Sequence, residues 1–110
     1  MKIDYVELPA RDLAAMKAFY GAAFGWAFED WGPDYMAFSN SGLEGGFRRT
    51  DDAPPRGGAL VILYADDLEA AEAAVTDAGG IIVDRHDFPG GRRFHFTDPS
   101  GNELAVWTKA

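Results

Sequence analysis

One stretch of the chain predicts a strand, a tight turn and a second strand: Phe94-His95-Phe96-Thr97-Asp98-Pro99-Ser100-Gly101-Asn102-Glu103-Leu104-Ala105-Val106-Trp107. Aromatic and polar residues alternate at its start, which is the period of two of a half-buried strand. Its middle consists of residue types that turns favour. Alternation then places two sets of side chains on opposite faces of a sheet. The predicted core set is Phe94, Phe96, Leu104 and Val106, and the predicted opposite set is Arg93, His95, Glu103, Ala105 and Trp107.

Working outward from this hairpin, the pattern predicts two helices and further short strands. The first helix begins after Asp12 as its N-cap and stops at Gly25, and the second is capped by Asp66 or Asp67 and ends at Gly79-Gly80. Strands are predicted over 3–8, 26–29, 35–38, 43–49, 59–65 and 81–84. Residues 86–91 are predicted to form a polar loop, in which His86 is solvated.

The two halves of the chain repeat one another. Asp12-Leu13 recurs as Asp67-Leu68, and Gly25 recurs as Gly80 at the same spacing. The repeat predicts two βαβββ modules, over 1–50 and 59–110, joined by a polar Pro/Gly-rich connector over 51–58. The fold class is therefore α+β, with eight strands in an open-barrel concave sheet and the helices outside, in one domain.

The composition is that of a small globular protein with an acidic surface. The 110 residues are 47% hydrophobic and 25% charged, carry a net charge of −8 and include no cysteine. No apolar run approaches the roughly 20 residues needed to span a bilayer, and the N-terminus lacks the pattern of a signal peptide. We expect a cytoplasmic protein that contacts neither membrane nor nucleic acid, since phosphates would be repelled.

The ordered set of motifs resembles the vicinal oxygen chelate superfamily, which includes glyoxalase I, bleomycin-resistance and fosfomycin-resistance proteins and extradiol dioxygenases. The motifs are Tyr5-Val6-Glu7-Leu8 with Asp12-Leu13, Phe19-Tyr20 with Phe24-Gly25-Trp26, Asp67-Leu68, Gly79-Gly80 and Asp98-Pro99-Ser100-Gly101-Asn102. The resemblance covers the whole chain and is closest to small bacterial glyoxalase-like proteins. It implies the fold above and a homodimer, which would also cover the edge strands of the modules.

The same resemblance implies where a metal would bind. Metal-binding members place His or Glu ligands at four positions, which fall here on Tyr5, Leu60, Ala105 and, near the last strand of module one, Glu44. Leucine and alanine have no donor atom, whereas a stable divalent site needs three or more ligands. We therefore expect no metal and no cofactor, and we expect protein purified without added metal to carry no stoichiometric divalent ion.

Strand parity predicts a small-molecule pocket on the concave face. The predicted ligand-binding residues are Tyr5, Leu60, Ile62, Tyr64, Arg93, Glu103 and Trp107, and the predicted catalytic residues are His95 and Glu7. Either Glu7 or Glu103 could pair with His95 as an acid–base couple. The favoured arrangement has Glu7, His95 and Arg93 at the polar end and aromatic side chains as the apolar wall.

Three classes of function follow and stay open. The first is a small-molecule binding or sequestering protein without metal, as in the bleomycin-resistance branch. The second is a glyoxalase-like lyase or isomerase, either metal-free through His95 and Glu7 or using a metal site at positions other than those inferred. The third is a dimeric accessory domain with a vestigial pocket.

Overall fold

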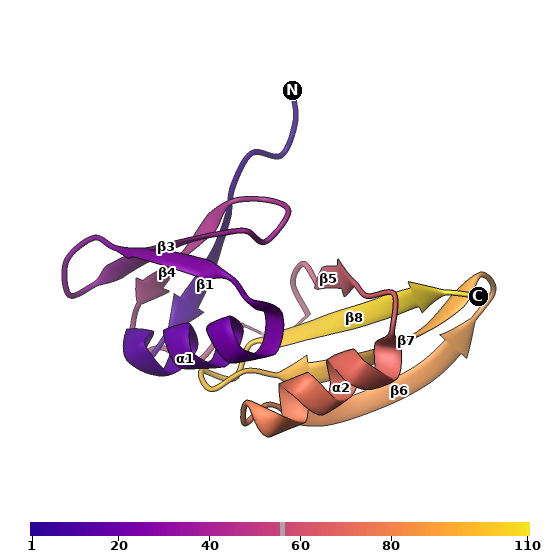
Figure 1. Cartoon of the computed structure of the whole chain (residues 1–110). Coiled ribbons are helices and arrows are strands. Elements are labelled where there is room, and N and C mark those ends of the chain that lie inside the picture. Colours follow the sequence, from indigo (N-terminus) through magenta and orange to yellow (C-terminus); the bar gives the residue numbers. More distant parts are fainter. Residues whose placement is uncertain (56) are drawn as a thin grey trace.

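The protein folds as two modules of the same element order (Figure 1), seen in a computed structural model that describes residues 1–55 and 57–110. Module one contains β1 (Val6–Ala10), α1 (Leu13–Phe24), β2 (Ala27–Asp30), β3 (Tyr35–Ser39) and β4 (Gly45–Arg49). Module two contains β5 (Val61–Tyr64), α2 (Leu68–Asp77), β6 (Ile81–Phe88), β7 (Gly91–Thr97) and β8 (Glu103–Lys109). Arg56, inside the predicted connector, lies outside the described residues.

Each module forms its own four-stranded mixed sheet. The strand orders are β1-β4-β3-β2 and β5-β8-β7-β6, in which β1 pairs with β4 and β5 pairs with β8 in parallel, and all other pairs are antiparallel. The predicted α+β fold of two βαβββ modules is confirmed. Its eight strands lie in two sheets that do not close into a barrel.

The helices begin where the sequence indicates. The carboxylates of Asp12 and Asp67 each accept a hydrogen bond from the backbone amide three residues on, at 3.1 and 3.0 Å. Gly25 ends α1 in the left-handed conformation, with φ of 71°. After α2 the left-handed residue is Gly79, with φ of 100°, whereas Gly80 allows close packing because an added Cβ would lie 2.6 Å from the side chain of Val75.

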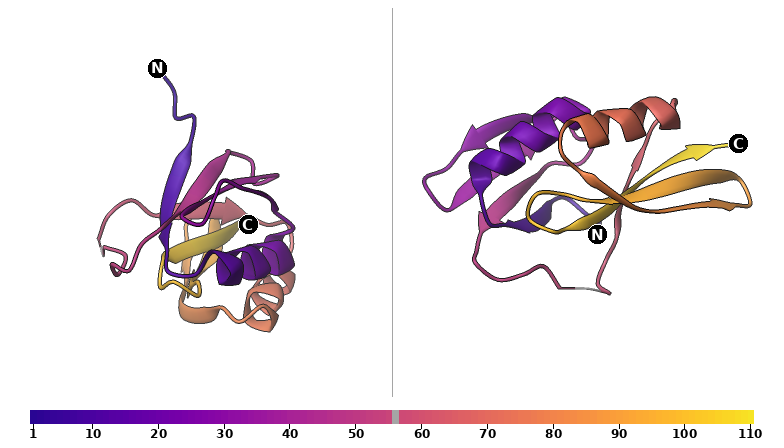
Figure 2. Two further views of the ribbon diagram at one scale, coloured as in Figure 1. Left: turned by 90° about the vertical axis from the view of Figure 1, so that its left-hand side faces the viewer. Right: turned by 90° about the horizontal axis from the view of Figure 1, so that it is seen from below.

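One hydrophobic core spans both modules. The helices lie side by side on one side of the molecule, in contact with each other (Figures 1 and 2). The ring of Phe19 in α1 contacts that of Phe96 in β7, with centroids 5.9 Å apart, so the helix of module one packs against the sheet of module two. The sheet face turned away from the helices is called the inner face from here on.

The turn between β7 and β8 joins the modules through buried polar groups. Tyr20 of α1 donates a hydrogen bond from its hydroxyl to Asp98 at 2.8 Å. Asn102 donates from its amide to Asp98 at 2.9 Å and to the carbonyl of Pro9 at 2.8 Å, while Ser100 accepts from the amide of Arg11. Burial, and then the charge of Asp98, raises the pKa of Tyr20 well above 10.0. The turn is thus an inter-module clamp.

Several strands begin or end elsewhere than predicted, and the differences in β1 and β6 matter most for the site. β1 starts at Val6 rather than at residue 3, and it includes Pro9. β6 continues to Phe88, so the prediction of a loop from residue 86 is wrong and His86 belongs to a strand. The ladder between β6 and β7 sustains this extension, because it pairs every residue from Asp84 to Phe88 with a partner.

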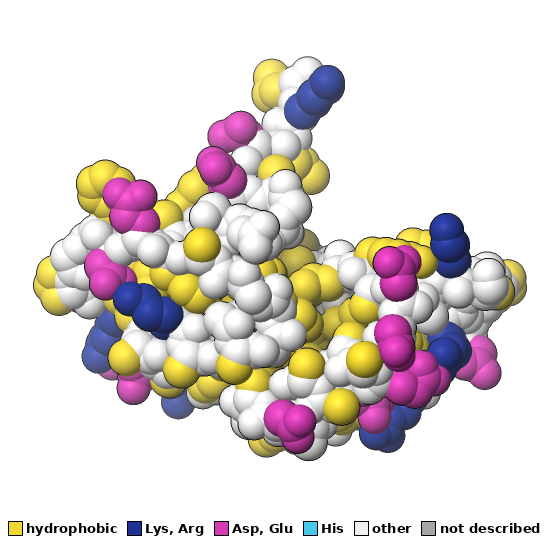
Figure 3. All heavy atoms as spheres, in the orientation of Figure 1, with side chains coloured by type: hydrophobic (Ala, Val, Ile, Leu, Met, Phe, Trp, Pro, Cys, Tyr) yellow, Lys and Arg dark blue, Asp and Glu magenta, His cyan; other side chains and the backbone are white. Residues whose placement is uncertain are grey.

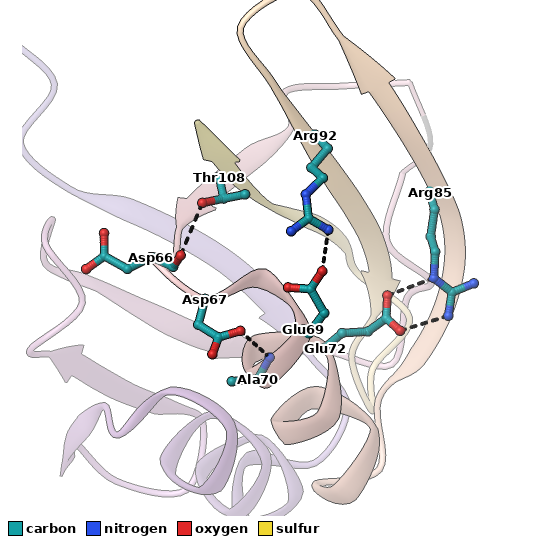
Figure 4. A network of polar contacts seen from close by, with 8 residues as sticks. All are labelled: Asp66, Asp67, Glu69, Ala70, Glu72, Arg85, Arg92 and Thr108. Atoms are coloured by element: carbon teal, nitrogen blue, oxygen red, sulfur yellow. Dashed lines mark hydrogen bonds and ion pairs between the residues drawn. The ribbon is translucent and has the colours of Figure 1, made fainter. Parts of the chain in front are cut away.

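Ion pairs fix α2 against the outer side of this extended strand pair (Figure 4). Glu72 of α2 accepts two hydrogen bonds from Arg85 of β6, at 2.7 and 2.9 Å, and Glu69 pairs with Arg92 of β7. Each exposed pair contributes little to stability, because solvent screens its charges. Together they show that Arg85 and Arg92 point toward the helix.

No helix among the described residues is long and apolar enough to cross a membrane.

Candidate functional site

The register of module two brings most of the predicted ligand-binding residues onto one inner face. Across β7 and β8, Arg93 lies opposite Trp107 and His95 lies opposite Ala105. Across β8 and β5, Ala105 lies opposite Ile62 and Trp107 lies opposite Tyr64. Leu60 precedes β5, and its side chain is exposed.

Aromatic rings form a continuous row across this face. The rings of Tyr64 and Trp107 meet edge to face with centroids 5.0 Å apart, and Trp107 lies 6.2 Å from Phe88. The guanidinium of Arg93 sits over the ring of Phe88 at 5.9 Å. The row therefore presents an apolar wall that ends in a cation.

His95 is the buried polar group of the inner face. The residue is only 7% exposed, and its Nδ1 lies 2.8 Å from a carboxylate oxygen of Glu103. Because a carboxylate only accepts hydrogen bonds, Nδ1 carries a proton, and in the neutral imidazole Nε2 then carries the lone pair. Nε2 is buried and has no hydrogen-bond partner among the described residues. An unpartnered buried nitrogen is costly unless something binds to it.

The other predicted site residues, Tyr5 and Glu7, lie in module one, where each pairs with a neighbouring side chain. The hydroxyl groups of Tyr5 and Tyr35 hydrogen-bond at 2.7 Å. Glu7 forms an ion pair with Arg48 at 3.4 Å. The carboxylate that contacts His95 is thus Glu103 rather than Glu7.

The positions that the superfamily uses for a metal do not fit one here. Ala105 is fully buried and offers only a methyl group, and Leu60 has no donor atom. The hydroxyl of Tyr5 is bound to Tyr35, and Glu44, the remaining carboxylate, is exposed just before β4. No reaction step can be assigned to a metal held at these positions.

Sequence reasoning missed three residues of the inner face: Asp84, His86 and Phe88. Asp84 lies opposite His95 in the ladder, and the rings of His86 and His95 are 5.4 Å apart. Only Phe88 among residues 84–88 is apolar, so no alternation of apolar and polar residues marks this stretch as a strand.

A groove of about 570 Å³ opens between the two modules, beside the inner face. Its lining is mostly apolar and includes Trp26, Phe38 and Leu43 of module one together with Ile62 and Tyr64 of module two. Figure 3 shows apolar side chains gathered in the hollow between the two halves, whereas carboxylates and cations lie over α2. The predicted pocket residues of β5 therefore border this groove as well as the aromatic row.

Solved structures share this arrangement of paired modules. The chain superposes with a TM-score of 0.85 on the fosfomycin resistance protein FosX of Listeria monocytogenes, at 15% identity, covering 100% of this chain and 94% of that one. It also superposes with a TM-score of 0.79 on a glyoxalase/bleomycin resistance protein/dioxygenase family enzyme of Burkholderia phytofirmans, at 19% identity, covering 97% and 98%. The chain therefore has the same fold as these two proteins.

A glyoxylase-like domain-containing protein of Didymella fabae is 29% identical over 98% of this chain and 94% of its own length. The glyoxalase-like domain family matches residues 4–107, and the chain belongs to that family.

Proposed function

We propose that this chain binds a small organic molecule on the inner face of module two, without a metal at the superfamily's ligand positions. The observation that carries the proposal is the row of Tyr64, Trp107 and Phe88 that ends at Arg93. An apolar surface with a few placed polar groups is the usual composition of a small-molecule site. A ligand with a planar apolar part would lie along the rings, and a polar substituent would reach Arg93 or His95.

The test is a thermal-shift screen of small aromatic compounds, followed by affinity measurements on variants. A compound at about 100 times its dissociation constant should add roughly 2.7 kcal/mol to the free energy of unfolding. Trp107→Ala should then weaken its binding at least tenfold, because a buried aromatic contact is worth about 2 kcal/mol or more. Trp31→Ala is the matched control, since Trp31 is exposed and lies outside this face. Equal affinity of the two variants would place the ligand elsewhere, and a screen without any shift would favour the vestigial pocket.

A second candidate, a metal-free glyoxalase-like lyase or isomerase, is favoured by the 2.8 Å contact between His95 and Glu103. Glu103 orients the imidazole so that Nε2 can accept a proton from a bound substrate. Turnover of a ligand found by the screen would support this candidate. Its rate should fall about 10²-fold or more in His95→Gln, while Glu7→Gln leaves it unchanged.

We also propose that two copies of the chain associate. Large apolar side chains are exposed on or beside the inner faces: Tyr5, Leu43, Leu60, Ile62 and Tyr64. A second copy would cover them and the free edge of β5, which has a paired neighbour only on its β8 side. Light scattering at micromolar concentration should give twice the chain mass of 11.9 kDa. A monomer would contradict the proposal.

A further inference from the structure

We propose that Asp84, His86 and His95 bind a divalent transition-metal ion such as Zn²⁺ on the inner face of the β6–β7 strand pair. One ligand atom from each of the three residues lies within 4.8 Å of the others. The site goes beyond the proposed function, because Asp84 and His86 belong to neither the predicted pocket nor the superfamily's ligand positions.

A β-bulge brings the three side chains together. The ladder pairs Ile82 with Phe96 on the core side and then shifts register, so that Asp84 pairs with His95. If Val83 were instead paired in a regular ladder, alternation from Ile82 would turn Asp84 and His86 toward the helices. A bulge that redirects a side chain is a recurrent feature beside functional sites. Here it delivers a carboxylate and an imidazole to the strand position next to His95.

His95 is the anchor of the site. Its Nδ1–H is held by Glu103, and in the neutral imidazole the buried Nε2 presents a lone pair for which the described residues supply no donor. A carboxylate bound to the far nitrogen of a histidine is the usual outer contact of a metal-ligating imidazole, since it fixes the tautomer and raises the basicity of the ligand atom. Glu103 is therefore a positioning residue of the metal site.

His86 offers the second nitrogen. Arg93 donates a hydrogen bond from Nε to Nε2 of His86 at 2.9 Å, so this nitrogen also carries a lone pair. The proton is on Nδ1, which faces Asp84 at 3.4 Å. The guanidinium thus occupies the place of a cation, and a metal ion would have to displace it. Arg93 has room to move because its side chain is only half-buried.

The donor set selects the kind of ion. Two imidazoles and one carboxylate suit Zn²⁺ and its neighbours, whereas Mg²⁺ and Ca²⁺ prefer oxygen ligands alone. Ligands about 2.0–2.1 Å from one ion lie roughly 3.3 Å apart, so the side chains must close inward. Asp84 and His86 can rotate to do so because both are exposed, while His95 stays fixed.

Calorimetric titration of the chelator-treated full chain with ZnCl₂ tests the proposal. We expect one Zn²⁺ per chain, no binding of MgCl₂, and loss of Zn²⁺ binding in Asp84→Asn and His86→Asn. Both substitutions are at exposed positions and should leave the fold intact, which a melting curve checks. Asp87→Asn is the matched control, because it removes the same charge from the helix-facing side of the same strand. Asp87→Asn should therefore bind Zn²⁺ like the wild type.

Two graded variants separate ligation from general charge attraction. Glu103→Gln should weaken Zn²⁺ binding by about 10–100-fold and keep the stoichiometry. Arg93→Met should strengthen it, by about tenfold, because a competing cation is removed. In ¹⁵N spectra of the imidazoles, Zn²⁺ should shift Nε2 of His95 more than its Nδ1. Absence of Zn²⁺ binding, or equal binding by His86→Asn and the wild type, would overturn the proposal.

Discussion

Gly46 in module one and Ala105 in module two occupy corresponding places, each in the last strand of its module and each opposite the first. Their surroundings differ. A Cβ on Gly46 would collide with the hydroxyl of Tyr35 and lie 2.6 Å from that of Tyr5. The methyl of Ala105 instead fills a space between His95 and Ile62, its partners on the flanking strands.

The polar groups of the two inner faces differ in the same way. In module one, Tyr5 pairs with Tyr35 and Glu7 pairs with Arg48, so these groups satisfy one another. In module two, Nε2 of His95 is left without a partner among the described residues. The repeat has thus kept the same folding signals in both halves, while only module two retains a buried group that still needs a partner. That is why both proposed sites lie there.

The largest expected effect concerns the two turns that follow the third strand of each module, where Asn40 and Asp98 correspond. Asp98→Ala removes the acceptor for the buried hydroxyl of Tyr20 and for Asn102, and should lower the free energy of unfolding by roughly 3 kcal/mol or more. Asn40→Gly removes one exposed hydrogen bond, to the carbonyl of Gly25, and should cost about 1 kcal/mol or less. Urea unfolding measures both. Equal losses would show that the turns are equivalent.

A smaller effect is expected from exchanging the two corresponding residues. Ala105→Gly should cost about 1–2 kcal/mol, from a lost buried methyl and the added backbone entropy of glycine. Gly46→Ala should push apart Tyr5 and Tyr35, whose exposed ends can move, at a cost of about 1 kcal/mol.

The exchange at Gly46 also has a spectroscopic readout. Burial and then the hydrogen bond with Tyr5 raise the pKa of Tyr35 above 10.0, so Gly46→Ala should return it toward that value. Ultraviolet titration of the phenolates would detect the change. An unchanged titration would mean that the tyrosine pair tolerates the methyl group.

The smallest effect concerns pH and the clamp at Asp98. Burial raises the pKa of this carboxyl above its usual 3.8, although hydrogen bonds from Asn102 and Tyr20 oppose the shift. The folded state then holds the proton more tightly than the unfolded state. The stabilisation that results from this difference in pKa is complete below pH 3.8. It is lost as the pH rises through the pKa of Asp98 in the folded protein. The stability of the wild type relative to Asp98→Asn should therefore decline from pH 3 to pH 7, and a rise would contradict this sign.

Much of the fold could be predicted because its signals are local. The N-caps Asp12 and Asp67, the glycine after α1 and the alternation in the last hairpin each act within a few residues. The sequence repeat predicted the topology, because two halves with the same motifs in the same order are expected to have the same βαβββ arrangement. The helix N-cap of α2 required a choice between Asp66 and Asp67, and the hydrogen bond to Ala70 identifies Asp67.

The candidate site was harder to predict, because it depends on register and on pairing between strands. Parity placed Tyr64, Trp107 and His95 on one face, but it could not tell which carboxylate reaches His95. The bulge after Ile82 exchanges the two faces of β6, so that residues expected to face the helices lie on the inner face. A prediction that assumes regular alternation along the strand misses this exchange. His86 was therefore assigned to a loop, and the expectation of a chain without metal rested on the superfamily positions alone.

The clamp has a consequence for how the chain folds. Its hydrogen bonds join Tyr20 to Asp98, Arg11 to Ser100 and Pro9 to Asn102, pairs that are 78, 89 and 93 residues apart. Contacts of such long sequence separation form slowly, because the entropy of closing the intervening loop must be lost first. The buried hydroxyl of Tyr20 in module one has no access to its hydrogen-bond acceptor, Asp98, until the β7–β8 turn has been synthesised. We therefore expect the two modules to fold as a single unit, without the independent, repeat-by-repeat folding of solenoid proteins.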